Sequence, residues 1–259
     1  MNILVIGDIV GRPGRRAIRT LLPDIKKEYN IAFTIANGEN ASGGRGLSYE
    51  VMDELFSYDI DVLTMGNHVW DNKEIFSYIN EQPRIIRPAN YPDPCPGHGY
   101  EIFESAGLKI LVINLSGRVF LAELDCPFKK IEQILSELSD QADLIIIDFH
   151  AEATSEKLAL AYYLDGRVNA ILGTHTHVQT ADERILPHGT AYITDLGMTG
   201  PVDSILGMNK EMVINKFLTQ RPVRLEVAKG KTQIEGVVLQ VDEIMKKVNN
   251  IARFSQIID

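Results

Sequence analysis

The chain has few of the features that a disulfide-stabilised or membrane-embedded protein needs. Only two of its 259 residues are cysteines, Cys95 and Cys126, and each stands beside prolines. They form neither a Cys-x-x-Cys metal pair nor a disulfide framework, so we expect free thiols in a reducing compartment. No apolar run approaches the roughly 20 residues of a membrane span, and no signal-peptide pattern opens the chain. The sequence therefore predicts a cytoplasmic protein without a membrane partner.

Positive charge is also scarce. The chain carries 26 Lys and Arg against 35 Asp and Glu, a net charge of −9. Its basic clusters are small, which argues against a protein that lives on duplex nucleic acid, where Lys and Arg neutralise phosphates. A small phosphorylated substrate stays compatible, because a metal ion can supply positive charge locally. With 45% hydrophobic residues, no repeat and no low-complexity tract, we expect one globular domain over residues 1–259.

Short apolar runs alternate with helix-like stretches in the first third of the chain. Strands are expected at residues 3–6, 32–36 and 62–65, and helices at 15–29, 49–58 and 73–79. Such a βαβαβ alternation predicts helices packed on a largely parallel sheet.

The remaining two thirds mix hairpins with further strands and helices. A hairpin is expected from residues 100–104 and 109–115, and a second from 223–227 and 234–241 around Lys229-Gly230-Lys231. Between them we expect helices at 128–138 and 155–164 and strands at 144–149, 170–172, 184–186 and 191–194. The whole pattern predicts an α/β fold with a mixed sheet or two packed sheets.

Five polar clusters each follow an apolar run directly. They are Gly7-Asp8, Asn37-Gly38-Glu39-Asn40, Gly66-Asn67-His68, Asp148-Phe149-His150 and Gly173-Thr174-His175-Thr176-His177. Ligands of open α/β sheets bind outside the carboxyl ends of the strands, so parallel strands would bring all five to one edge. Carboxylate, amide and imidazole donors without thiolate suit Mn, Fe, Zn or Co. The ordered set therefore predicts a metal centre.

Each cluster taken alone has a simpler interpretation. Asp8 could cap a helix, Glu39-Asn40 could form a polar turn, and Asn67 could bond its own backbone. His150 at a strand end could be a satisfied polar residue. The pair His175 and His177 is harder to explain this way, because two imidazoles after a buried strand are costly without partners. Two residues apart on an extended segment, they point to the same side.

The series of motifs resembles that of the calcineurin-like metallophosphoesterases, and within them the bacterial YmdB-like branch. The resemblance covers most of the chain, from Gly7-Asp8-Ile9-Val10-Gly11 to Gly173-Thr174-His175-Thr176-His177. Val10 replaces the usual histidine of the first motif, Glu39-Asn40 replaces Gly-Asp-x-x-Asp, and Val69 stands where an acid is common. These departures match the branch and argue against protein-phosphatase activity. Residues 194–200 also fit the branch but offer no obvious ligand.

The resemblance implies a fold, an activity and a ligand set. The fold would be mixed sheets packed as a sandwich and flanked by helices. The activity would be a two-metal phosphodiesterase, similar to those acting on 2′,3′-cyclic nucleotides, with Fe or Mn as its ions. Asp8, Asn40 and His177 would hold one ion, Asn67, His150 and His175 would hold the other, and Glu39 would bridge them.

The mechanism is a hypothesis on this resemblance. A hydroxide shared by two ions would attack phosphorus, and His68 would protonate the departing ribose oxygen. The alternative is that His68 only orients a ligand or caps the turn. Arg45, in the glycine-rich stretch after Asn40, either neutralises phosphate or lies in a flexible turn. His98 and His188 are assigned no role.

Two other functions compete with the phosphodiesterase. A regulatory protein could bind a nucleotide or RNA through the same metal site and turn it over slowly. A di-iron redox protein would use a helix bundle with Glu-x-x-His pairs, and the sequence has neither. We expect the protein to bind a small cyclic phosphodiester and not duplex nucleic acid. The sequence leaves homo-oligomerisation open.

Overall fold

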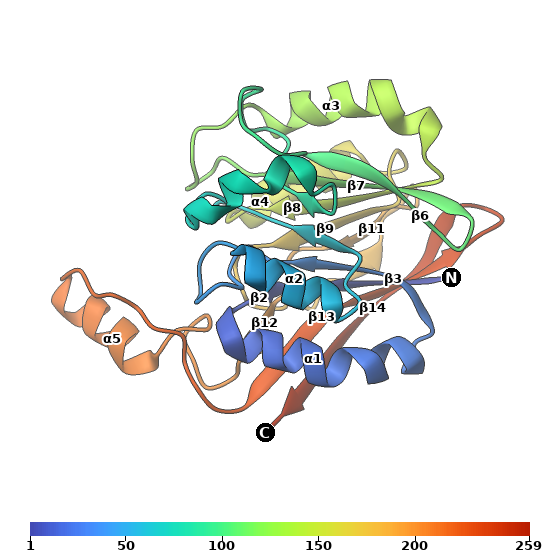
Figure 1. Ribbon diagram of the computed structural model, residues 1–259. Helices are drawn as coiled ribbons and strands as arrows, with labels where there is room; N and C mark the ends of the chain where they lie inside the picture. Colours follow the sequence, from blue (N-terminus) through green and yellow to red (C-terminus); the bar gives the residue numbers. More distant parts are fainter.

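The computed structural model describes residues 1–259 and is built of four layers, helix, sheet, sheet, helix (Figure 1). Helices α1 (Gly11–Glu28) and α2 (Tyr49–Ser57) cover the outer face of the first sheet. Helices α3 (Pro127–Leu138) and α4 (Thr154–Tyr163) cover the outer face of the second. The predicted α/β sandwich flanked by helices is therefore confirmed.

The first sheet has eight strands, in the order β2-β12-β13-β1-β3-β4-β5, with β14 also paired to β13. Its strands are β1 (Asn2–Ile6), β2 (Asp8–Ile9), β3 (Ile31–Asn37), β4 (Val62–Thr64), β5 (Ile85–Ile86), β12 (Met198–Pro201), β13 (Thr232–Asp242) and β14 (Lys247–Ile258). Strands β1, β3, β4 and β5 are parallel, as the βαβαβ pattern predicts.

The second sheet has six strands, in the order β10-β11-β9-β8-β7-β6. They span β6 Tyr100–Ser105, β7 Leu108–Ser116, β8 Leu144–His150, β9 Ala170–Thr174, β10 Arg184–Ile185 and β11 Ala191–Ile193. Strands β7, β8, β9 and β11 are parallel, while β6 and β10 form antiparallel edges. The predicted first hairpin is β6–β7.

Three hydrophobic clusters hold the layers together. The central one lies between the two sheets, and its members alternate along the strands, as in Ile3 and Val5 of β1 and Ile110 and Val112 of β7. Alternate residues of these strands, such as Leu4 and Ile6, face the helices instead. Both faces of each parallel strand are therefore buried, which explains why these strands read as continuous apolar runs.

Two predicted elements differ from the structure. Residues 73–79 form not one α-helix but two 3₁₀ helices, η1 (Lys73–Ser77) and η2 (Ile79–Glu81), separated at Tyr78, whose hydroxyl donates to the carbonyl of Leu47. A third, η3 (Ser139–Gln141), follows α3.

The predicted hairpin of residues 223–227 with 234–241 is wrong. Strand β13 pairs with β14 along one edge, and β1 and β12 occupy the other. No edge of β13 is left for residues 223–227, which belong instead to an arm that carries α5 (Lys210–Thr219) away from the sheets (Figure 1). No helix combines the length and the apolar character that crossing a membrane requires.

Candidate metal centre

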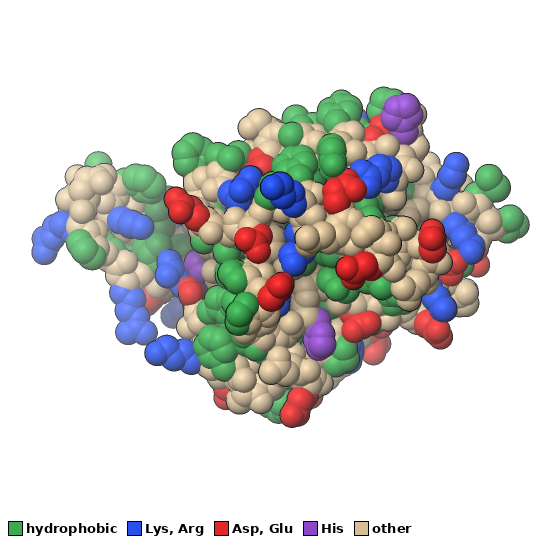
Figure 2. Space-filling model, turned by 90° about the horizontal axis from the view of Figure 1, so that it is seen from above, with side chains coloured by type: hydrophobic (Ala, Val, Ile, Leu, Met, Phe, Trp, Pro, Cys, Tyr) green, Lys and Arg blue, Asp and Glu red, His purple; other side chains and the backbone are tan.

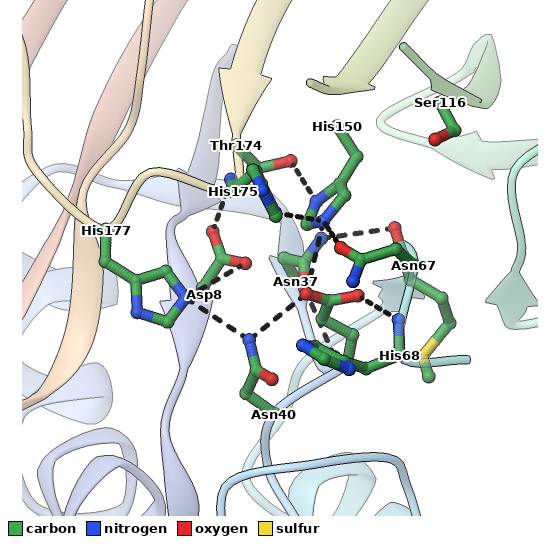
Figure 3. A network of polar contacts seen from close by, with 12 residues as sticks. Asp8, Asn37, Asn40, Asn67, His68, Ser116, His150, Thr174, His175 and His177 are labelled. Carbon is green, nitrogen blue, oxygen red and sulfur yellow. Dashed lines mark hydrogen bonds and ion pairs between the residues drawn. The ribbon is translucent and has the colours of Figure 1, made fainter. Parts of the chain in front are cut away.

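The five polar clusters converge at the carboxyl ends of parallel strands from both sheets (Figure 3). Asp8 follows β1, Glu39 and Asn40 follow β3, and Asn67 and His68 follow β4. His150 ends β8, while His175 and His177 follow β9. All the ligand-type residues predicted from sequence therefore lie close together, in two subgroups joined by Glu39.

The first subgroup surrounds the Nε2 atom of the fully buried His150. This nitrogen lies 2.9 Å from Asn67 Oδ1, 3.0 Å from His175 Nδ1 and 3.2 Å from Glu39 Oε1. Glu39, His150 and His175 each offer a donor atom within 4.8 Å of the others. We call His150, His175 and Asn67 the His150 group.

Two side chains behind His150 determine which of its nitrogens carries hydrogen. The Thr174 hydroxyl donates to Asp148 at 2.6 Å and lies 2.9 Å from His150 Nδ1. With its hydrogen directed at Asp148, this hydroxyl can only accept from Nδ1–H. The neutral tautomer of His150 then presents a lone pair on Nε2, the form that binds metal.

The second histidine of the group is oriented in the same way from the other side. His175 Nε2 lies 3.1 Å from a carboxylate oxygen of Glu152, which accepts its hydrogen. Its Nδ1 therefore also presents a lone pair, opposite His150 Nε2 at 3.0 Å. Two nitrogen lone pairs and two oxygen acceptors facing one another repel, so this position requires a positive charge.

The pKa values of the two histidines reflect that requirement. Burial would lower the pKa of His150, but the charges of Glu39 and Asp8 and the contact with Glu39 raise it to about 9. Burial and the positive charge on His150 lower the pKa of His175 to about 4. One proton in the group thus excludes a second, and a cation would take its place.

The second subgroup consists of Asp8, Asn40 and His177, which we call the Asp8 group. Asp8 is fully buried; its Oδ2 accepts from the His175 backbone N–H at 3.2 Å, while its Oδ1 has no hydrogen-bond partner. His177 Nδ1 donates to the Leu206 carbonyl at 3.1 Å, so its Nε2 faces Asp8 Oδ1 at 3.6 Å. Burial would raise the pKa of Asp8, but the contact with His177 holds it below its ordinary range.

Asn40 connects the two subgroups through its amide nitrogen. Its Nδ2 lies 3.2 Å from both Glu39 Oε1 and His177 Nε2. The oxygen of this amide faces away, and a half-turn of the amide group would exchange the two atoms. Burial would raise the pKa of Glu39, but the charge of His150 keeps it lowered, so Glu39 is a carboxylate between the subgroups.

His68 approaches the centre in two ways. Its backbone N–H donates to Glu39 Oε2 at 2.9 Å, and its ring Nδ1 lies 2.8 Å from Asp71 Oδ2. The imidazole is one quarter exposed. Asp71 thus orients a ring that stands at the accessible rim of the donor cluster.

Close packing requires glycine beside the donors. A Cβ on Gly66 would lie 2.3 Å from His150 Nε2 and 2.5 Å from Glu39 Oε2. Any side chain at this position would displace donor atoms of the centre, which explains the glycine before Asn67.

The loop that carries His175 and His177 is held in an unusual conformation. Both histidines have positive φ, 102° and 63°. The buried Lys157 ammonium donates at 2.8 Å to the Thr174 carbonyl and to Asp195, which accepts from the Thr176 N–H at 3.0 Å. This buried ion pair stabilises a backbone that would otherwise be unfavourable.

The other polar residues considered from sequence lie outside the donor cluster. Arg45 is exposed and its guanidinium lies 3.9 Å from Asp71. His98 contacts the Asn80 carbonyl, and the backbone of His188 donates to Asp165. Neither histidine contacts a donor of the centre.

The residues that orient the metal-binding side chains and their loop were not identified from the sequence. Thr174 and Asp148 stood inside the quoted clusters, and Asp195 stood inside the stretch 194–200 that offered no ligand. Glu152 follows His150 by two residues and Asp71 follows His68 by three, a spacing that could have drawn attention to both. Lys157 gave no signal, because a lysine on an amphipathic helix is ordinarily exposed.

The donor set fits metal cations. It joins carboxylate, amide and imidazole atoms without a thiolate, which suits divalent metals that accept mixed oxygen and nitrogen ligands. The unpartnered Asp8 oxygen and the converging lone pairs around His150 are unfavourable features that a cation would relieve.

Comparison with known proteins agrees with this geometry. The family model described as YmdB-like protein matches residues 4–254. The chain is 53% identical to a 2′,3′-cyclic-nucleotide 2′-phosphodiesterase of Bacillus subtilis, with 98% of this chain and 96% of the relative covered.

Solved structures share the fold closely. A protein of Thermus thermophilus superposes with a TM-score of 0.94 at 42% identity, covering 99% of each chain. A structure titled as a novel phosphatase, from Mycoplasma pneumoniae, gives 0.94 at 36% identity, covering 99% of this chain and 93% of that one. With a family match over nearly the whole chain and a relative above half identity, this protein belongs to the YmdB-like family.

Proposed function

We propose that the protein is a metal-dependent phosphodiesterase that hydrolyses small cyclic phosphodiesters, with 2′,3′-cyclic nucleotides as its substrates. The observation that carries the proposal is the convergence of four acceptor atoms on one point beside His150. The 53% identical relative named for this activity supports the substrate class. Both sheets supply donors, so residues 1–259 would act as one domain around one centre.

Two cations would be held by seven residues. The His150 group would hold one, the Asp8 group would hold the other after the Asn40 amide turns, and Glu39, which lies between the two groups, would bridge them. Bound cations would supply the charge that activates water and offsets the negative phosphate. The donor chemistry is compatible with Fe or Mn.

His68 would act as the general acid. Its Nδ1 faces Asp71, so Nε2 is the atom available to donate a proton to the departing ribose oxygen. Because the ring is tied to the centre through its own backbone N–H and Glu39, it would move little on substrate binding. Proton donation of this kind contributes about 10²–10⁴-fold to rate.

The substrate proposal is tested by hydrolysis of 2′,3′-cyclic nucleotides and of a generic phosphodiester. Apo-protein would be reloaded with Mn or Fe, and activity measured against metal content. We expect metal-dependent hydrolysis of the cyclic substrates. Tight nucleotide binding without hydrolysis in either metal would contradict the proposal and favour a regulatory protein.

The general-acid role is tested by His68→Asn. We expect turnover of a cyclic nucleotide to fall about 10²–10⁴-fold with unchanged metal content. A phosphodiester with a p-nitrophenolate leaving group needs no proton, so the variant should retain most of its activity on it. The exposed loop residue His188→Asn is the matched control. Equal losses on both substrates would exclude proton donation by His68.

A further inference from the structure

A basic cavity lies beside the candidate metal centre. It has a volume of about 950 Å³ and opens between the start of α1, the loop 43–45 and the arm 208–230. Its lining contains six cationic side chains, Arg12, Arg16, Arg45, Lys216, Arg224 and Lys229, and one acidic side chain, Glu226. Figure 2 shows Lys and Arg side chains gathered around a hollow where the arm leaves the body.

These cations have almost no acidic partners, although Arg16 donates to the Gly230 carbonyl at 2.9 Å. Only Arg45 approaches a carboxylate, that of Asp71 at 3.9 Å, and the other five form no ion pair. In a chain of net charge −9, six cations around one concave surface are a local reversal of the overall charge. Such a concentration repels itself and attracts anions of matching shape.

Segments adjacent to the candidate metal-binding residues also line the cavity. Gly43 lines it and follows Asn40 by three residues, so at most about 11 Å of chain separates them. Arg45 contacts Asp71, which contacts His68. On the other side, the Leu206 carbonyl orients His177, and Met208 already lines the cavity.

We propose that this cavity, here called the basic pocket, binds the backbone phosphates of a short single-stranded oligonucleotide whose terminal cyclic phosphodiester lies at the metal centre. The proposal rests on the proposed function. Single cations at spaced positions match the repeated charges of a strand, and no aromatic ring lines the pocket for base stacking. Recognition would therefore not depend on base sequence.

The kinetic test compares a 2′,3′-cyclic mononucleotide with a trinucleotide that ends in a 2′,3′-cyclic phosphate. We expect a higher kcat/KM for the trinucleotide. In the double variant Arg224→Glu with Lys229→Glu, the ratio of the two kcat/KM values should fall by about tenfold or more, since hydrogen bonds to charged groups are lost. The control, Arg19→Glu with Lys247→Glu, reverses two exposed cations outside the pocket and should leave the ratio unchanged.

Salt gives an independent measure of phosphate contacts. If two or three phosphates are neutralised, trinucleotide affinity should fall roughly tenfold between about 50 and 200 mM salt. The pocket variant should show a shallower slope than the control. Equal slopes in the two variants would overturn the proposal.

A binding measurement separates the pocket from catalysis. Fluorescence anisotropy of a labelled, 3′-phosphorylated hexanucleotide measures binding without turnover. It therefore tests the pocket even if neither substrate is hydrolysed. Absence of hydrolysis would overturn the proposed function but not the pocket. Weaker binding in the pocket variant than in the control supports the proposal. Unchanged binding overturns it. The proposal is also overturned if tripolyphosphate displaces the labelled strand as well as an unlabelled hexanucleotide does, because the pocket would then be assigned to small polyphosphates.

Discussion

The two subgroups of the candidate metal centre differ in how completely they are assembled. Around the His150 group, three atoms, one of them from Glu39, lie within 3.2 Å of His150 Nε2, and the side chains of Thr174 and Glu152 orient the imidazoles. In the Asp8 group, one carboxylate oxygen accepts no hydrogen bond, the Asn40 amide presents its nitrogen, and His177 is oriented by the Leu206 carbonyl. The His150 group is preorganised, whereas the Asp8 group must rearrange to bind.

Preorganisation lowers the cost of binding, so we expect the His150 group to hold the tighter cation. The two subgroups also differ in what supports them. Asp148 belongs to β8 and Thr174 to β9, in the middle of a sheet, whereas Leu206 lies in the connection between β12 and α5, outside both sheets. The following predictions test this difference.

Removing one histidine from each subgroup should give unequal effects. We expect His150→Ala to lower kcat/KM by about 10³-fold or more, since it removes the atom on which the donors converge. His177→Ala should cost less and should be partly restored by excess metal. Kinetics and metal content at graded metal concentrations measure both. Equal losses of kcat/KM and equal metal requirements in the two variants would show that the two subgroups do not differ in preorganisation.

The loop between the subgroups should depend on its buried ion pair. Lys157→Met leaves Asp195 buried and unpaired, and we expect the free energy of unfolding to fall by about 3–5 kcal/mol. Denaturant unfolding measures it. Lys210→Met, which removes an exposed ion pair with Asp203, is the matched control and should have a much smaller effect. Similar losses of unfolding free energy in the two variants would mean that the buried ion pair stabilises the protein no more than the exposed one.

The hydroxyl behind His150 should tune one subgroup selectively. Thr174→Val removes the group that fixes the His150 tautomer, and we expect the affinity of the tighter metal to fall about 10–100-fold. Thr199→Val removes a buried hydroxyl that has no partner and should leave the affinity unchanged. Metal competition titrations distinguish the two. A loss confined to the weaker metal would reverse the assignment of subgroups.

Much of this arrangement could be predicted from the sequence, because its signals are local. Apolar runs such as Ile3 to Ile6 can be recognised as strands from a few consecutive residues, and residues that follow parallel strands meet at one edge. The same reasoning failed for residues 223–227. Their alternation resembled a strand, but strand formation needs a free edge, and β14 and β1 occupy those of β13.

The sequence by itself determined the alternation of strands and helices, the residue types at the strand ends and, from these, the donor chemistry of the centre. Only the tertiary structure decided which nitrogen of His150 faces the centre, which partner neutralises Lys157, and which cations form the basic pocket. These depend on residues far apart in the chain: Lys157 and Asp195 are separated by 38 positions, and Arg16 reaches the Gly230 carbonyl across 214. Contacts at such separations leave no periodic signal, because they arise only when packing brings the segments together.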